Sequence, residues 1–298
     1  MRSSVIRRLG WISVGAAFTV AAVAVLRTAH GQDAAASTEA AAQRAARFKE
    51  MDEIIGSIRI SALDDRGMEK SAVMSEGPLL RWTDPTRDFS DGAFWVWRVS
   101  GRPVAVVGIE LYAAWSLEFV SLSTRRLKAD AHGNRWTPES GGVDFKEIPD
   151  APVPASDEAG RLRQMRELAK QFNAREFWVG NGQHYALRLL PRPVDRYSDA
   201  ASGVVDGSLF VYAHGTNPEV VLMLEARRND VGPPKWSFAA APLTHAETEL
   251  RIANGEVWKS LSKDPPNVPI STDPYYDFLT PRRGIQGPRP STPRRVRP

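Results

Sequence analysis

Two stretches of the chain show the same order of apolar and polar positions. The first covers residues 91–111 (DGAFWVWRVSGRPVAVVGIEL) and the second covers residues 206–226 (DGSLFVYAHGTNPEVVLMLEA), and they match without a gap at an offset of 115 residues. In each stretch a run of aromatic and β-branched residues leads into a short polar turn, a proline and a second apolar run. This pattern is typical of a β-hairpin. We therefore expect two β-hairpins.

The likeness of the two stretches favours an internal duplication over two unrelated hairpins. Period-2 alternation places Ala105, Val107 and Ile109 on one strand face, which we expect to be core. Alternation explains matching apolar residues, but not a matching aspartate, glycine, proline or glutamate. The six identical pairs are Asp91/Asp206, Gly92/Gly207, Val96/Val211, Pro103/Pro218, Val106/Val221 and Glu110/Glu225.

A segment with helical spacing of apolar residues precedes each hairpin. These segments are residues 45–55 and 162–172, and the proline-rich residues 149–156 (PDAPVPAS) between the two halves are typical of a linker. A helix followed by an antiparallel sheet buries the helix stripe on one sheet face. The sequence therefore predicts an α+β fold of two related units, residues 32–150 and 151–262, each with a helix packed on a mainly antiparallel β-sheet.

Both ends of the chain differ in composition from the rest. Residues 1–31 carry four arginines and no acid, contain an apolar run and end in Ala-His-Gly, as expected of a cleaved secretory signal peptide. An uncleaved membrane anchor is the alternative, because the apolar run approaches the length of a spanning helix. Residues 263–298 are rich in proline and arginine, so we expect a largely disordered tail.

Charge and cysteine content narrow the classes of function. The formal net charge is +4, but the two ends hold ten arginines and no acid, so residues 32–280 carry a net charge of −6. An acidic body does not indicate nucleic-acid binding, which requires basic charge clustered on a folded face. The chain has no cysteine, which excludes disulfides, thiolate metal sites and cysteine nucleophiles.

Several segments resemble a family of secreted proteins from planctomycete bacteria whose function is not known. The resemblance extends over most of residues 40–260, and it implies export and a shared fold but no catalytic residue. The segments that carry it are LRQMRELAKQF (162–172), LRLLPRPVDRY (187–197), DGSLFVYAHGTNPEVVLMLEAR (206–227) and GEVW (255–258).

Known catalytic and cofactor-binding motifs are absent from the sequence. There is no HExxH, GxSxG, P-loop or GxGxxG pattern. Four histidines follow the predicted signal peptide, and their spacing places no two of them on one face of a helix or strand. We therefore expect each of them to be a surface or turn residue rather than a metal ligand. These histidines are His132, His184, His214 and His245. The sequence therefore predicts no metal site and no cofactor.

Two pairs of residues remain as candidates for a site. If exposed, Trp95 and Trp97 would stack against sugar rings; if buried, they fill the core, and their replacement by Phe210 and Tyr212 in the second stretch favours burial. Glu110 and Glu225 lie on the strand face opposite the uniformly apolar one, where burial is not required. They would form a catalytic carboxylate pair if they lay close together, or else would end their strands in water or pair with an arginine such as Arg98 or Arg227.

These features predict an exported binding or structural module of the periplasm or cell envelope. The alternative is an extracytoplasmic hydrolase, acting on glycans through paired carboxylates, and the sequence leaves open whether the protein is an enzyme. For such a module, the binding partner that we expect is a glycan or a protein of the cell envelope. We expect membrane contact only through an uncleaved signal segment.

Overall fold

The computed structural model describes residues 38–64, 66–84, 89–112, 114–253, 255–261 and 271–280. The chain forms two compact units, residues 1–54 and 55–298. In the first unit the described residues are α-helical, and this helix ends at residue 56. The predicted signal peptide, residues 1–31, and the end of the predicted tail, residues 281–298, lie outside the described residues.

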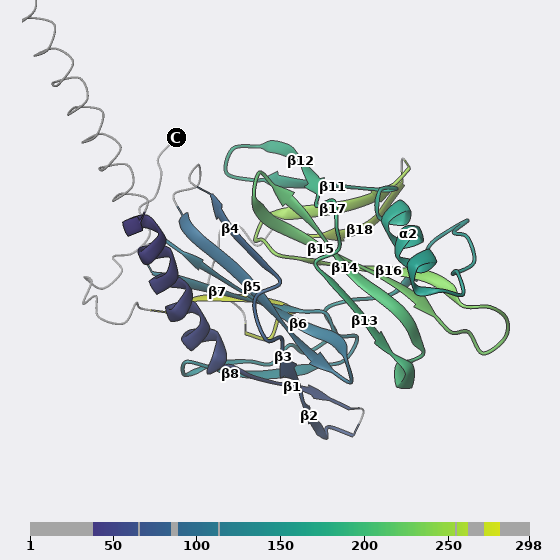
Figure 1. Ribbon diagram of the computed structural model, residues 1–298, viewed down its shortest axis with the longest axis horizontal. Helices are drawn as coiled ribbons and strands as arrows, with labels where there is room; N and C mark the ends of the chain where they lie inside the picture. The colour runs from purple at the N-terminus through teal and green to yellow at the C-terminus, as the bar shows by residue number, and fades with distance from the viewer. Residues whose placement is uncertain are drawn as a thin grey trace, which may run out of the picture. The chain divides into compact units, whose positions relative to one another are not determined.

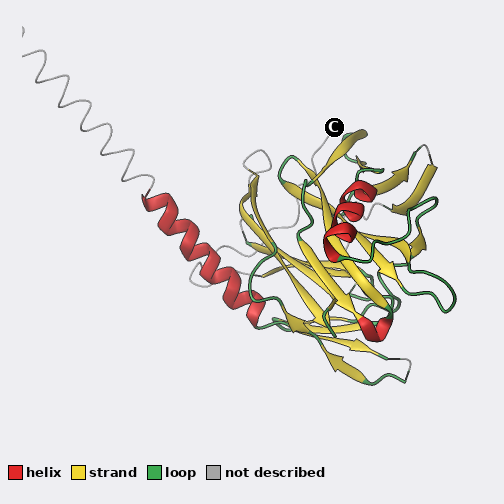
Figure 2. Cartoon of the chain, turned by 45° about the vertical axis from the view of Figure 1, so that its right-hand side comes forward, coloured by secondary structure: helices red, strands yellow, loops and turns green. Residues whose placement is uncertain are grey.

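The second unit consists mainly of antiparallel strands arranged in three sheets (Figure 1; strands are yellow in Figure 2). Two of the sheets are built mostly from the first half of the chain. The four-stranded sheet has the order β2 (Glu69–Ser71), β1 (Arg59–Leu63), β8 (Leu127–Ala131), β9 (Asn134–Trp136). The six-stranded sheet has the order β19 (Tyr275–Thr280), β7 (Trp115–Ser121), β6 (Arg102–Leu111), β5 (Phe89–Val99), β3 (Val73–Met74), with β4 (Leu80–Asp84) also paired to β5.

The third sheet is built mostly from the second half of the chain. Two other elements of this half are the helix α2 (Glu158–Ala169) and the short 3₁₀ helix η2 (Ala200–Ser202). The nine-stranded sheet has the order β10 (Lys146–Glu147), β16 (Lys235–Pro242), β15 (Asn217–Arg227), β14 (Val204–His214), β12 (Gln183–Leu189), β11 (Phe172–Trp178), β17 (Glu247–Ile252), β18 (Gly255–Ser260), with β13 (Asp195–Asp199) also paired to β14.

The predicted α+β fold of two helix-on-sheet units is wrong, because strands make up most of the structure. Helical segments do form where the apolar spacing indicated them, but α2 has only 12 residues. The two large sheets instead bury side chains against each other. In addition, β10 of the first half pairs with β16, and β19 from the end of the chain pairs with β7. Sheet-on-sheet packing therefore organises the second unit.

Both predicted hairpins form, and their strands are paired in the same register. Gly92 lies opposite Glu110 in the β5–β6 hairpin, as Gly207 lies opposite Glu225 in the β14–β15 hairpin. On the other side of each hairpin, Glu110 lies opposite Ser116 of β7 and Glu225 lies opposite Ser237 of β16. This correspondence concerns strand pairing, and descent of the two halves from a duplicated ancestor stays a prediction.

The aspartate shared by the two hairpins has the same partner in each. Asp91 accepts two hydrogen bonds from Arg81 of β4, at 2.9 and 2.6 Å. Asp206 accepts two from Arg196 of β13, at 2.9 and 2.5 Å, and is also paired with Arg161 of α2. Two parallel bonds between a guanidinium and a carboxylate fix the geometry of both groups. Each aspartate therefore holds a neighbouring strand in register.

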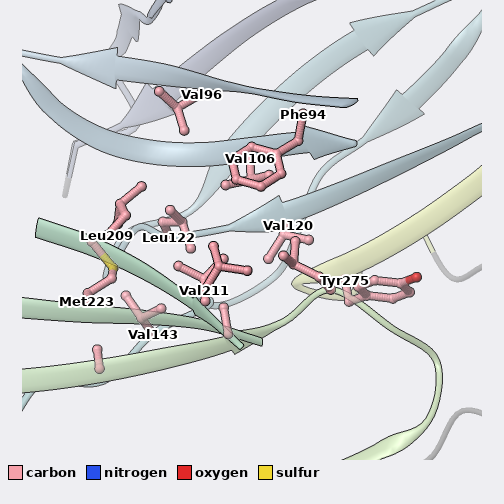
Figure 3. Close-up of a cluster of buried hydrophobic side chains, with 14 of the residues drawn as sticks. Phe94, Val96, Val106, Val120, Leu122, Val143, Leu209, Val211, Met223 and Tyr275 are labelled. Carbon is pink, nitrogen blue, oxygen red and sulfur yellow. The ribbon is translucent and has the colours of Figure 1, made fainter. Parts of the chain in front are cut away.

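The main hydrophobic core lies between the six-stranded and the nine-stranded sheets (Figure 3). Phe94, Val96 and Val106 extend from one sheet toward Leu209 and Val211 of the other. Burying a large apolar side chain stabilises a fold by about 1.5–3 kcal/mol, so this layer contributes much of the stability. A second cluster, on the far face of the nine-stranded sheet, contains the apolar side of α2.

The strand β6 is buried on both faces, from Arg102 to Leu111. The face opposite Ala105, Val107 and Ile109, which the sequence did not assign to the core, is therefore buried as well. Glu110 and Glu225 are among the buried residues rather than at wet strand ends. Alternation correctly identified the strands, but it does not show how many layers cover a sheet.

Candidate functional site

The carboxylate of Glu225 is buried between two guanidinium groups. Its Oε1 accepts hydrogen bonds from Arg102 Nε at 2.8 Å and from the Tyr197 hydroxyl at 2.9 Å, and its Oε2 accepts one from Arg227 Nη1 at 2.8 Å. Both guanidinium groups lie over the ring of Phe145, at 4.9 and 5.0 Å from its centroid. Burial, together with the nearby Glu225 carboxylate, raises the pKa of Tyr197 well above its usual value. These contacts hold the two arginines side by side.

Arg102 and Arg227 line a cleft of about 720 Å³. The hairpin of β1 and β2, the β5–β6 turn and the segment at η2 form its other walls. The lining is mixed, with aliphatic carbons, hydroxyl groups and four basic side chains. The polar and charged lining residues are Asp64, Glu69, Lys70, Ser100, Arg102, Ser123, Thr124, Arg125, Asp199, Ser202 and Arg227.

The three acidic residues that line the cleft each accept a hydrogen bond or form an ion pair within the protein. Asp199 accepts hydrogen bonds from the Ser202 hydroxyl and amide, Asp64 accepts from two backbone amides, and Glu69 is paired with Lys128. Lys70 donates to the neutral hydroxyl of Ser100. Within the described part of the chain, neither Lys70 nor Arg125 lies at ion-pair distance from an acid. Of the four basic side chains that line the cleft, Arg102 and Arg227 thus share the carboxylate of Glu225, and Lys70 and Arg125 are left to meet a ligand.

Glu110 lies in a different environment, among carboxyl groups. It accepts a hydrogen bond from Tyr112 at 3.0 Å. The half-buried Glu118 of β7 is beside it on the same sheet face, and Asp277 of β19 lies directly opposite Glu118. Burial raises the pKa of Glu118 well above its usual value, and the charges of Glu110 and Asp277 raise it further. The Tyr275 hydroxyl, at 3.1 Å from Glu118, opposes this rise in the pKa.

The predicted pairing of Glu110 with Glu225 is not among these contacts. The partners of Glu225 are Arg102, Tyr197 and Arg227, whereas Glu110 interacts with Tyr112 and Glu118. Arg227 is one of the two arginines that the sequence offered as a partner. The other, Arg98, is paired instead with Asp195 at 2.7 Å. Each glutamate thus takes part in a separate cluster.

Trp95 and Trp97 are both buried in the core. They lie on the face of β5 opposite Phe94 and Val96, which face the nine-stranded sheet. A sugar-stacking platform needs an exposed ring face. In this structure the two rings act as core residues, the role that their exchange for Phe210 and Tyr212 favoured.

A third cluster joins His214 to two buried glutamates. His214 Nδ1 is in close contact with Glu176 Oε1, and one ligand atom from each of Glu176, His214 and Glu219 lies within 4.8 Å of the others. The spacing of the histidines indicated a surface or turn position for His214, and it did not reveal this cluster. The five-residue separation of His214 and Glu219 across a hairpin turn was the available signal; nothing local pointed to Glu176.

Comparison of the chain with known protein families, curated proteins and solved structures finds no match to any of them. In the described residues, no helix has both the length and the apolar character needed to cross a membrane. The resemblance to secreted planctomycete proteins therefore stays an expectation from the sequence, and the clusters above are the basis for assigning a function.

Proposed function

We propose that this protein is an exported, non-enzymatic binding module of the cell envelope, and that its cleft beside Arg102 and Arg227 holds an acidic glycan. Export rests on the charge and apolar pattern of residues 1–31. The observation that carries the binding role is a cleft of about 720 Å³ lined by four basic side chains, of which Lys70 and Arg125 lie at ion-pair distance from no acid of the described residues. Clefts of this volume suit small ligands.

The chemistry of the lining fits carboxylated or sulfated sugars. Guanidinium groups recognise planar anions through paired hydrogen bonds. The hydroxyls of Ser100, Ser123 and Thr124 can donate to or accept from sugar hydroxyls. The interior between the large sheets is filled by apolar side chains, which supports a binding role over catalysis at a buried interface.

Titration calorimetry with a galacturonate hexamer and a heparin-derived hexasaccharide tests this proposal. We expect at least one acidic probe to bind and its affinity to fall as salt rises, because screening weakens surface electrostatics. The fully methyl-esterified galacturonate hexamer has the same backbone without the charge and is expected not to bind. Failure of both acidic probes, or equal binding of the neutral one, would contradict the proposal.

Variants locate the binding in the cleft. Lys70→Ala together with Arg125→Ala removes two positive charges from the lining, and we expect at least a tenfold loss of affinity. Arg135→Ala is the matched control, since Arg135 is exposed, paired with Asp130 and not among the lining residues. An equal effect of the control would place the binding elsewhere.

A second candidate function is an extracytoplasmic hydrolase acting on glycans. The observation that favours it is the pair of neighbouring carboxyl groups of Glu118 and Glu110, because burial and the charge of Glu110 raise the pKa of Glu118 well above its usual value, as acid catalysis by a carboxyl group requires. Release of reducing sugar from a panel of envelope glycans tests it. Glu118→Gln and Glu110→Gln are expected to abolish hydrolysis, whereas Glu225→Gln is expected to leave it unchanged, because Glu225 belongs to a separate cluster.

A further inference from the structure

We infer that Glu176, His214 and Glu219 bind a divalent transition-metal ion. Each residue offers one ligand atom, and the three atoms lie within 4.8 Å of one another. Imidazole nitrogen with two carboxylate oxygens is a ligand set found at zinc and related metal sites. The site is separate from the arginine-lined cleft and does not depend on its function.

Strand pairing explains how these distant residues meet. The turn between β14 and β15 places His214 directly opposite Asn217. On the other side, β12 lies between β14 and β11, with its Tyr185 opposite Glu176. The Tyr185 ring packs on the His214 ring at 4.6 Å between centroids. The imidazole is therefore held between the hairpin turn and Glu176.

A β-bulge redirects the third ligand. Pairing passes from Tyr212↔Val220 to Ala213↔Pro218, which leaves Glu219 as the extra residue on β15. Bulges turn a side chain out of the regular alternation and occur near functional sites. Here the bulge carries the Glu219 carboxylate to the histidine at the end of β14.

The first half of the chain contains the same backbone frame without the ligands. The β5–β6 hairpin has its bulge at Val104, and its residue corresponding to His214 is Val99. By the register of β1 with β2 and of β11 with β12, Glu176 corresponds to Ala62. Three apolar residues in one half thus stand where the other half has Glu, His and Glu. The fold does not require polar groups at these positions, which favours a specific role for them.

Asn217 supplies an independent indication of a ligand. Its Nδ2 donates to Glu219 Oε1 at 3.0 Å, and this bond sets the orientation of the amide. Its Oδ1 is buried and has no hydrogen-bond partner among the described residues, and the residue as a whole is only 8% exposed. A buried amide oxygen without a partner destabilises a folded protein, because it has lost its hydrogen bonds to water. A bound cation would satisfy this oxygen as a fourth ligand.

Charge and access also suit a cation. Glu176 and Glu219 are 1% and 0% exposed, whereas the His214 side chain is 31% exposed. Two carboxylates and a neutral imidazole match the charge of a divalent ion, and a bound metal would replace the contact between His214 and Glu176. The exposed edge of His214 gives an ion a route to the buried carboxylates.

The experiment measures Zn²⁺ and Co²⁺ binding by the purified full-length chain. After dialysis with excess metal and gel filtration, we expect about one equivalent of zinc by elemental analysis, and the Co²⁺ form should show visible absorption bands of a nitrogen- and oxygen-ligated ion. Glu219→Gln should weaken binding at least tenfold in a chelator competition. Stoichiometric removal of zinc by EDTA should lower the melting temperature.

A variant that carries the corresponding residues of the first half separates loss of metal binding from loss of folding. Glu176→Ala, His214→Val and Glu219→Val together install the residues of the first half, so we expect a folded protein that binds no zinc and whose melting temperature does not respond to EDTA. His245→Gln is the matched control, because His245 is paired with Asp277 at 3.1 Å outside the cluster. Retention of zinc by the folded triple variant, or no zinc on the unmodified chain, would overturn the inference.

Discussion

The carboxyl group of Glu118 shows how burial changes the pKa of a single residue. Desolvation and the neighbouring charges of Glu110 and Asp277 all disfavour its ionised form. Its folded-state pKa therefore lies above the unfolded-state value, and the folded protein retains a proton that the unfolded chain loses. The stability that this carboxyl contributes is fully present below the unfolded-state pKa and is lost as pH rises toward the folded-state pKa.

Replacement of Glu118 by Gln is expected to flatten this pH dependence. The amide keeps an acceptor for the Tyr275 hydroxyl and cannot ionise. The gain in unfolding free energy relative to the unmodified protein should grow with pH above about 4.5, by at most roughly 1.4 kcal/mol per pH unit. Urea denaturation at a series of pH values between 4 and 8 measures it. Parallel curves for the two proteins would contradict the assigned cause.

At the scale of elements, a glycine beneath an aromatic ring recurs in both hairpins. Trp82 of β4 lies opposite Gly92, and Tyr197 of β13 lies opposite Gly207. A Cβ atom at Gly207 would stand 2.6 Å from the Tyr197 ring, and one at Gly92 would stand 2.5 Å from the Trp82 ring. The shared glycine thus lets a ring from the neighbouring strand lie on the hairpin backbone.

Gly207→Ala is accordingly expected to destabilise the protein by about 1–3 kcal/mol, since the Tyr197 ring must shift in a packed core. The shift would also disturb the Tyr197 hydrogen bond to Glu225. Gly180→Ala provides the comparison, because no atom lies within 4 Å of a Cβ at Gly180. Chemical denaturation gives the unfolding free energy of both variants. Equal values would show that the Tyr197 ring shifts without loss of stability.

Helix α2 begins with a side-chain cap. The Asp157 carboxylate accepts a hydrogen bond from the Gly160 amide at 2.7 Å, and this bond lowers the pKa of Asp157. Its contribution to stability is present above the unfolded-state pKa and is lost as pH falls through the folded-state pKa. We expect Asp157→Ala to lower the melting temperature at pH 7 more than at pH 3. A uniform decrease across this range would argue against the cap.

Across the whole second unit, side-chain contacts join the two halves of the chain. Arg102 of the first hairpin reaches Glu225 of the second, and Arg98 reaches Asp195. With both partners of the first pair almost fully buried, loss of one leaves a charge without its full compensation. These contacts orient the halves, while the apolar layer between them contributes much of the stability.

We expect Arg102→Met to lower the unfolding free energy by about 2–4 kcal/mol, because Glu225 retains only Arg227 and Tyr197 as partners. Combining it with Glu225→Leu should recover part of this loss. Arg135→Ala removes an exposed ion pair and is expected to cost less than about 1 kcal/mol. Additive effects of the two changes in the double variant would mean that the pair is not coupled.

The terminal segments give a further prediction for the whole molecule. Composition alone indicates that residues 1–31 and 281–298 contribute little to the fold. A chain of residues 32–280 should therefore melt at the same temperature as a chain of residues 32–298 in differential scanning calorimetry. A loss of several degrees on removal of residues 281–298 alone would show that the basic tail docks on the acidic body.

The sequence by itself determined the local elements. Alternating apolar residues and polar turns predicted both hairpins, and helical spacing indicated where helices form. Such features depend on backbone conformation and on neighbours within a few residues, so they can be recognised from a short window. The closeness of His214 and Glu219 is of this kind, since a hairpin turn joins their strands.

Only the tertiary structure decided which faces are covered and which distant side chains meet. Strand periodicity defines two faces but does not specify what packs on them, so the fold class was predicted wrongly and the burial of Glu110 and Glu225 was not foreseen. Arg102 meets Glu225 across 123 residues, and Glu176 meets His214 across 38. These contacts depend on the order of strands in the sheets, which is set by packing over the whole chain and leaves no local pattern.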